Sequence, residues 1–192
     1  MHKLKTYFEE VNQVLEQTPL AEIAYAVDLL IQTQTEGSRI FVMGNGGSAA
    51  MASHFACDLG KGTVIGDKPR FKVYSLADNI PMLTAYGNDV GYEVVFSEPL
   101  ESLAEPGDVA VLISSSGNSP NIINAADKAK DLQLKTIGVT GFQGGKLREK
   151  VDVCVIVPTD SEHPDCMQHA EDAQGIVLHA IFVAIRQRLN NS

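Results

Sequence analysis

Apolar residues along the chain follow two alternating patterns. Nearly continuous apolar runs of strand length occur at 39–43, 71–76, 108–114, 134–140 and 151–157. After four of them, over about 48–59, 79–87, 119–131 and 167–189, apolar positions recur at the spacing of amphipathic helices. Strands that are apolar on both faces are buried on both faces of a parallel sheet. The pattern therefore predicts the α/β class, a three-layer α/β/α sandwich around a five-stranded parallel sheet.

The first 37 residues contain no strand-like run. Apolar residues recur at helical spacing up to Leu15, and Thr18-Pro19 then interrupts the pattern. A second helical stretch runs from about 20 to 35 and ends before Gly37, a suitable C-cap. We expect residues 1–37 to form a helical hairpin for packing or assembly, followed by one α/β domain over 38–192.

Composition and charge narrow the class of protein. The 192 residues are 44% hydrophobic and 20% charged, as in an ordinary globular domain, with no apolar run of membrane-spanning length and no secretory leader. The 24 acidic and 15 basic residues give a net charge of −9, which disfavours direct binding to nucleic acid or an anionic membrane. Cys57, Cys154 and Cys166 show no C-x-x-C spacing, so we expect buried free thiols in a cytoplasmic protein.

A glycine-rich segment, GNGGSA (44–49), follows the first apolar run and opens a helix. Gly44, Gly46 and Gly47 let the backbone turn tightly and approach a ligand closely. Ser48 adds a hydroxyl where the free N–H groups of a helix start favour a phosphate. Two alternatives remain: a plain tight turn, or a dinucleotide site, since the segment fits G-x-G-x-x-[GA] and Asp78 is a possible ribose ligand.

A serine-rich segment, ISSSGNSPN (113–121), follows a second apolar run and also opens a helix. It carries four hydroxyls, on Ser114, Ser115, Ser116 and Ser119. Such neutral donors, together with free amides, can surround a phosphate without any lysine, although a capped turn with surplus serines is the alternative. Two such loops at the carboxyl ends of strands in one sheet favour a ligand site there.

Together, GNGGSAAMASHF (44–55) and LISSSGNSPNII (112–123) resemble the sugar isomerase (SIS) domain family, and within it the phosphoheptose isomerase branch. The resemblance also covers GNDVGYE (87–93), VTGFQGG (139–145) and the terminal helix. It implies a flavodoxin-like sheet, a homotetramer and active sites at subunit interfaces. It further implies that the sugar phosphate contacts Asn45, Gly46, Gly47, Ser48, Asn88, Asp89, Ser114, Ser115, Ser116 and Ser119.

Two ionisable residues share one face of the helix after the first loop. His54 and Asp58 are four residues apart, a spacing that suits a metal site or an acid–base pair as well as an ordinary ion pair. The resembling branch carries histidine and glutamate at these positions, with the glutamate as proposed base and, in some members, both as zinc ligands. Asp58 is one methylene shorter, which retracts its carboxylate by about 1.5 Å.

The terminal helix supplies the remaining candidates. His179 matches the proposed acid of the branch, and Glu171 stands where the branch carries a glutamine that acts at the site. Eight residues span about 12 Å of a straight helix, so Glu171 and His179 can share one metal only if the helix is irregular or separate subunits contribute. Gln168 replaces an expected aspartate, and we expect His163 and His169 at the surface.

The resemblance implies an enzyme that interconverts an aldose and a ketose phosphate through an enediol, with sedoheptulose 7-phosphate or a related sugar phosphate as substrate. Asp58 is the expected base and His179 the expected acid, meeting across an interface. A zinc ion on His54, Asp58, Glu171 or His179 is the candidate cofactor, and no nucleotide is expected. The alternative is a non-catalytic SIS protein that binds sugar phosphates or associates with a replication initiator.

Overall fold

The computed structural model describes residues 2–191 and contains a five-stranded, wholly parallel sheet. The strand order is β2-β1-β3-β4-β5. The strands are β1 (Arg39–Gly44), β2 (Lys72–Ser75), β3 (Val109–Ser114), β4 (Lys135–Gly141) and β5 (Val153–Val157). All five predicted strands are present in the sheet, and β3 is buried at every position, as expected of a strand covered on both faces. The edge strand β2 differs, because its positions alternate between exposed and half-buried.

Helices occupy every segment for which helical periodicity was predicted. They are α1 (His2–Gln17), α2 (Leu20–Glu36), α3 (Gly47–Gly62), α4 (Ile80–Asp89), α6 (Pro120–Asp131) and α7 (Cys166–Asn191). A short helix, α5 (Ser97–Leu103), was not predicted, because seven residues are too few for a periodic pattern to stand out. Gly37 caps α2 in the left-handed conformation, as expected.

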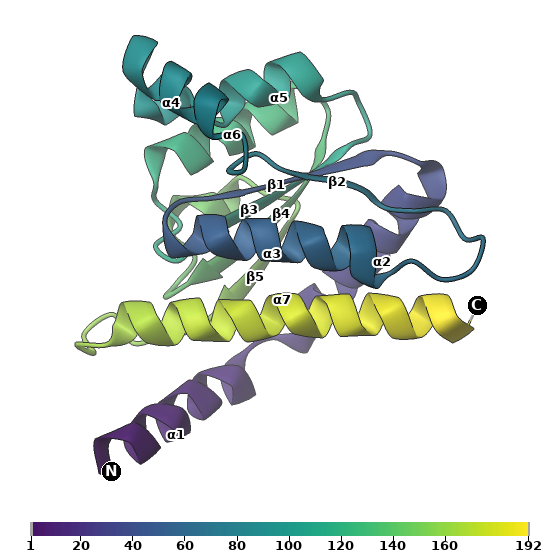
Figure 1. Ribbon diagram of the computed structural model, residues 1–192. Helices are drawn as coiled ribbons and strands as arrows, with labels where there is room; N and C mark the ends of the chain where they lie inside the picture. The colour runs from purple at the N-terminus through teal and green to yellow at the C-terminus, as the bar shows by residue number, and fades with distance from the viewer. Residues whose placement is uncertain (1, 192) are drawn as a thin grey trace.

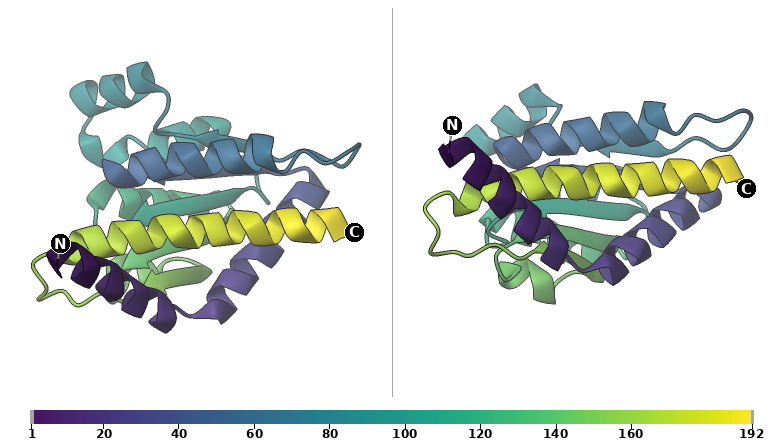
Figure 2. Two further views of the ribbon diagram at one scale, coloured as in Figure 1. Left: turned by 60° about the horizontal axis from the view of Figure 1, so that its bottom comes forward. Right: turned by 90° about the horizontal axis from the view of Figure 1, so that it is seen from below.

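The helices form two layers, one on each face of the sheet (Figures 1 and 2). The core on one face joins β1, β3, β4 and β5 to α2, α3 and α7, and the core on the other joins β1 and β3 to α5 and α6. Helices α3 and α7 lie side by side and run in the same direction (Figure 1). We call their line of contact the α3–α7 seam: Gly47 faces Glu171 at one end, and Gly62 faces Phe182 at the other.

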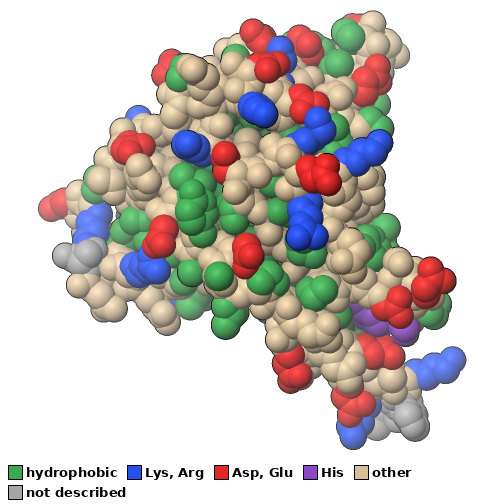
Figure 3. All heavy atoms as spheres, turned by 180° about the vertical axis from the view of Figure 1, so that it is seen from behind, with side chains coloured by type: hydrophobic (Ala, Val, Ile, Leu, Met, Phe, Trp, Pro, Cys, Tyr) green, Lys and Arg blue, Asp and Glu red, His purple; other side chains and the backbone are tan. Residues whose placement is uncertain are grey.

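Helices α1 and α4 extend beyond these layers. Helices α1 and α2 meet at Thr18-Pro19 and form a V, with α1 against α7 (Figure 2). Helix α4 has no buried residue and exposes Ile80 at its start. Within the described residues, no helix is long and apolar enough to cross a membrane. The face in Figure 3 mixes acidic and basic side chains with exposed apolar ones.

The cysteines depart in part from expectation. All three are free thiols, but Cys57 is exposed and the other two are only partly buried. Helix α3 buries Ala52, Phe55 and Leu59 against the sheet, so Cys57 falls on the opposite side of the helix. Burial raises the pKa of the Cys154 thiol, which makes its reactive thiolate scarcer.

Candidate functional site

The two loops predicted from sequence meet at the carboxyl ends of β1 and β3. They enclose a hollow of about 160 Å³, here called the serine pocket. Seven polar or charged side chains line it together with two apolar ones: Asn45, Ser48, Ser114, Ser115, Ser116, Ser119 and Glu171 with Ile113 and Met167. The position agrees with the general location of ligands in parallel α/β sheets.

The glycine loop presents backbone donors to this pocket. Gly46 has a φ of +52°, in the region that favours glycine, and α3 starts at the next residue. The first turn of a helix leaves its N–H groups without intrahelical partners, so those of Gly47 and Ser48 are available to an anion. Ser48 itself is 5% exposed, and its hydroxyl makes no hydrogen bond to any side chain of residues 3–191, those whose side chains the structure describes.

The serine loop has a fixed internal hydrogen-bond pattern. The hydroxyl oxygens of Ser114 and Ser119 are 3.3 Å apart, so one donates to the other. The hydroxyl of Ser116 accepts from the backbone N–H of Asn118 at 3.2 Å, which leaves its own proton free. Pro120 begins α6 as predicted, with Ser119 at the N-cap position, although the Ser119 side chain makes no capping hydrogen bond.

Asn45 is held by two residues that the sequence did not single out. Its amide exchanges two hydrogen bonds with the amide of Asn121, at 2.9 and 2.8 Å. The hydroxyl of Tyr92 donates to the same Oδ1 of Asn45 at 3.1 Å. Both lone pairs of that oxygen are therefore used, and Asn45 can offer a ligand only its remaining N–H.

A cluster of three ionisable side chains lies further along the α3–α7 seam. Asp58 places one carboxylate oxygen 3.7 Å from Nε2 of His54 and the other 3.6 Å from Nε2 of His179. The two imidazole rings stand 4.9 Å apart at 80°. We call this group the His–Asp cluster. Asp58 and His179 were expected to meet across an interface, but α3 and α7 bring them together within one chain.

Glu171 does not join that cluster. Helix α7 is regular from Cys166 onward, so the eight residues between Glu171 and His179 keep them about 12 Å apart. Glu171 instead lines the serine pocket, where a Cβ on Gly47 would lie 2.9 Å from its carboxylate. The site thus has a carboxylate beside the place predicted for a phosphate.

The residues of the His–Asp cluster fit a zinc ion by number and spacing. Among residues 3–191, whose side chains the structure describes, they are the one group of three or more such residues placed to hold a metal ion, and their ligand atoms all lie within 4.8 Å of one another. Ligand atoms around a tetrahedral zinc with bonds of about 2.1 Å stand roughly 3.4 Å apart, close to the separations seen from Asp58. Three protein ligands would leave one position open for a ligand oxygen.

Other residues considered from the sequence line neither the serine pocket nor the His–Asp cluster. Asn88 and Asp89 end the projecting helix α4, and the amide of Asn88 donates to Asp89 at 2.7 Å. Asp78 accepts a hydrogen bond from Ser53. The surface position expected for His169 is wrong: α1 covers this residue, and its ring lies 4.9 Å from that of Tyr7 and is 4% exposed.

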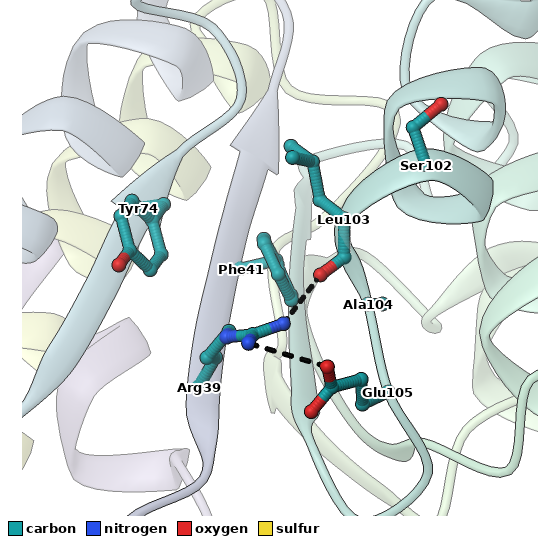
Figure 4. Close-up of a pocket in the computed structure, with 7 residues that line it drawn as sticks. All are labelled: Arg39, Phe41, Tyr74, Ser102, Leu103, Ala104 and Glu105. Carbon is teal, nitrogen blue, oxygen red and sulfur yellow. Dashed lines mark hydrogen bonds and ion pairs between the residues drawn. The ribbon is translucent and has the colours of Figure 1, made fainter.

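A separate hollow of about 430 Å³ lies between β1, β2 and the end of α5 (Figure 4). Phe41 and Leu103 supply apolar surface, and Arg39 donates to the Leu103 carbonyl at 2.7 Å and pairs with Glu105. Arg39 is the first residue of β1, so the hollow reaches the amino ends of the strands. It contains no acid–base pair and is a weaker candidate than the serine pocket.

Comparison with known proteins places this fold and site in a family. The SIS domain model matches residues 6–141, and the chain belongs to the SIS domain family. It is 42% identical over 154 residues to a phosphoheptose isomerase of Aliarcobacter butzleri, covering 79% of each chain. It is 36% identical over 189 residues to that of Syntrophotalea carbinolica, covering 97% of this chain and 93% of the relative.

The fold comparison agrees with the sequence comparison. The structure of the phosphoheptose isomerase of Neisseria gonorrhoeae superimposes with a TM-score of 0.85 at 30% identity, covering 96% of this chain and 97% of that one. The family and fold expected from the two loops are thereby confirmed.

Proposed function

We propose that this protein is an aldose–ketose isomerase for a sugar phosphate, with sedoheptulose 7-phosphate as the first substrate to test. The observation that carries the proposal is the Asp58 carboxylate held between two imidazoles, with His179 at 3.6 Å, on a fold whose relatives are phosphoheptose isomerases. A protein that only binds sugar phosphates has no need of an acid–base pair, so the non-catalytic alternative is not favoured.

The reaction moves one proton between two neighbouring carbons. From the ketose, Asp58 removes a proton from C1 while His179 donates a proton to the carbonyl oxygen at C2, which gives the enediol. Return of a proton to C2 and loss of the proton on the C1 oxygen complete the aldose. Nε2 of His54 lies 3.7 Å from the other carboxylate oxygen of Asp58, near enough for an ion pair when the imidazole is protonated.

The serine pocket suits the phosphate of the substrate. Ser48, Ser116 and one hydroxyl of the Ser114–Ser119 pair can donate, together with the N–H groups at the start of α3. This neutral set of donors explains how a chain with a net charge of −9 can hold a phosphate. A fixed phosphate would also set the register of the sugar against the base.

The length of the substrate bears on whether one chain or two supply the site. Ser48 and Asp58 are ten residues apart on one helix, which is about 15 Å along its axis. From C2 to phosphorus, an extended heptulose 7-phosphate spans roughly 9 Å, and contacts of about 3 Å at each end bring its reach to about 15 Å only when the sugar is fully extended. We propose that the serine pocket of one copy works with the His–Asp cluster of another, as in the interface sites and the homotetramer expected from sequence.

Two variants test the reaction and this arrangement together. Ser116→Asp places a negative charge in the serine pocket, and His179→Ala removes the acid, so each homo-oligomer should be inactive on sedoheptulose 7-phosphate. Random co-assembly of the two chains should restore about a quarter of the sites if each site takes its two parts from different copies. No recovery would assign both parts to one chain, and no turnover by the native protein would overturn the isomerase proposal.

Zinc is the metal that the His–Asp cluster suits, with His54, His179 and one oxygen of Asp58 as its ligands. Bound there, it would polarise the carbonyl oxygen in place of the proton from His179, and the second oxygen of Asp58 would remain the base. The proposal predicts bound zinc in the native protein and its loss in His54→Ala. Elemental analysis of both proteins, purified without added metal, decides this point. The three free thiols and a sugar-phosphate substrate are consistent with the cytoplasmic location expected from sequence.

A further inference from the structure

A buried glutamine lies directly behind the serine pocket. Gln174 is on α7 and has no exposed surface, in a stretch of the helix that also buries Ala170, Ala173 and Val177. A primary amide in such surroundings costs free energy unless both of its polar atoms are hydrogen-bonded. Its presence on the core side of α7 therefore calls for partners on the sheet or the loops.

Both polar atoms of Gln174 are used, and they join two different elements. Its Nε2 donates to the carbonyl of Val139 on β4 at 3.0 Å, and its Oε1 accepts from the hydroxyl of Ser115 at 2.8 Å. The carbonyl of Ser115 in turn accepts from the N–H of Gly141 at 2.8 Å. Ser115 is thus fixed through its hydroxyl and its backbone carbonyl.

The Ser115 hydroxyl has only one proton, and it donates that proton in the hydrogen bond to Gln174. A phosphate oxygen is only an acceptor, so it cannot use the oxygen that remains on Ser115. Ser115 is 6% exposed, whereas Ser116 beside it keeps its proton free. The four serines of this loop therefore cannot all be hydroxyl donors to one phosphate.

We propose that Gln174 is a positioning residue for phosphate binding, which acts by holding the Ser115 hydroxyl and so sets the conformation of the serine loop. Ser115 then serves the ligand through its backbone alone, and the hydroxyl donors are those of Ser48, Ser116 and the Ser114–Ser119 pair. This inference rests on the proposed function of the serine pocket, and it changes the role expected for Ser115 from its sequence.

Only glutamine combines the required length with one acceptor and one donor. Gln174→Met keeps the volume close to the original but leaves the Val139 carbonyl and the Ser115 hydroxyl without partners. Ser115→Ala removes the same bond from the other side with a much smaller change. Gln187→Met is the matched control, because Gln187 is exposed on the same helix.

The test measures the dissociation constants of inorganic phosphate and sedoheptulose 7-phosphate by calorimetry. Gln174→Met and Ser115→Ala should each weaken binding about tenfold, and the double variant should be no weaker than either, because both substitutions break one interaction. Ser116→Ala should add to their effect. At saturating substrate, kcat should stay within about twofold of the native value, with the loss confined to KM.

Three outcomes would overturn the proposal. Weaker binding in Ser115→Ala with native binding in Gln174→Met would make Ser115 a direct hydroxyl donor. Additive losses in the double variant would have the same meaning. A lower Tm in Gln174→Met with intact phosphate binding would make the residue only structural. If the native protein binds neither phosphate compound, the serine pocket itself is misassigned, and the proposed function fails with it.

Discussion

The serine pocket and the His–Asp cluster, at two places along the α3–α7 seam, differ in the kind of side chain that they bring together. At the serine pocket, the hydrogen-bond donors are neutral hydroxyls and amides, most of them buried or held by other protein atoms, and Glu171 is the charged side chain beside them. At the His–Asp cluster, three ionisable side chains face one another, and the two histidine side chains are 62% and 55% exposed. In the proposed function, phosphate recognition therefore rests on neutral donors fixed by the fold, whereas proton transfer rests on ionisable side chains.

This difference predicts that binding and turnover can be separated by mutation. The largest expected effect is that of Asp58→Asn, which keeps the shape of the side chain but removes the base. We expect kcat to fall by about a thousandfold, as is typical for loss of a general base. The dissociation constant of sedoheptulose 7-phosphate should change by less than about threefold, since the serine pocket is untouched.

The measurement is steady-state turnover beside calorimetric binding, with Asp67→Asn as a control on an exposed acid between α3 and β2. Equal losses in binding and turnover would mean that Asp58 holds the sugar rather than moves its proton.

The second prediction concerns the donor that Asn45 presents. Asn121→Leu removes the amide that holds Asn45, so we expect the affinity for sugar phosphate to fall about tenfold, the value of roughly one well-placed hydrogen bond. Asn124→Leu is the control, because Asn124 lies on the same helix and donates to the backbone of Glu93 instead. If the two variants bind equally well, the amide pair has no part in presenting Asn45.

The sequence predicted the framework of this site better than its hydrogen bonding. Apolar runs located all five strands, and glycine and serine segments located the two loops, because the apolar pattern of a strand and the residue types of a turn are local properties of the sequence. The spacing of eight residues also placed Glu171 and His179 far apart on one regular helix. These predictions needed no knowledge of which elements pack together.

What the sequence did not predict depends on contacts between distant segments. Gln174 and Ser115 are 59 residues apart, and Asn45 and Asn121 are 76 residues apart. His169 is buried only because α1 folds over it, which no local pattern indicates. A polar residue on the apolar side of a predicted helix, such as Gln174, is the one signal that could have marked a partner behind the loop.

The third prediction follows from the carboxylate in the serine pocket. Glu171→Gln removes a like charge near the proposed phosphate and keeps the length of the side chain. We expect phosphate to bind about fivefold more tightly, a modest gain because the pocket is open to water. Glu162→Gln, on an exposed turn before α7, is the control. Weaker binding in Glu171→Gln would instead show that the carboxylate accepts hydrogen bonds from the sugar.

The smallest predicted effect concerns a contact outside the serine pocket and the His–Asp cluster, where α1 packs on α7. The hydroxyl of Tyr7 donates to Asp172 at 2.6 Å, and burial, followed by this bond, raises the pKa of Tyr7 from 10.0 to about 12. A raised pKa means that the folded state favours the protonated phenol. Its contribution is therefore complete below about pH 10 and is lost as the pH rises toward 12.

Tyr7→Phe should lower the free energy of unfolding by about 0.7 kcal/mol at neutral pH, since the bond is partly exposed. The native protein and the variant should become equally stable as the pH approaches 12, because the native phenol then ionises in both states. Urea unfolding at several pH values measures this, with Tyr25→Phe on the exposed side of α2 as control. If the difference in unfolding free energy persists unchanged to pH 12, the bond to Asp172 is not its cause. Binding and turnover should stay at native values, because Tyr7 touches neither the serine pocket nor the His–Asp cluster.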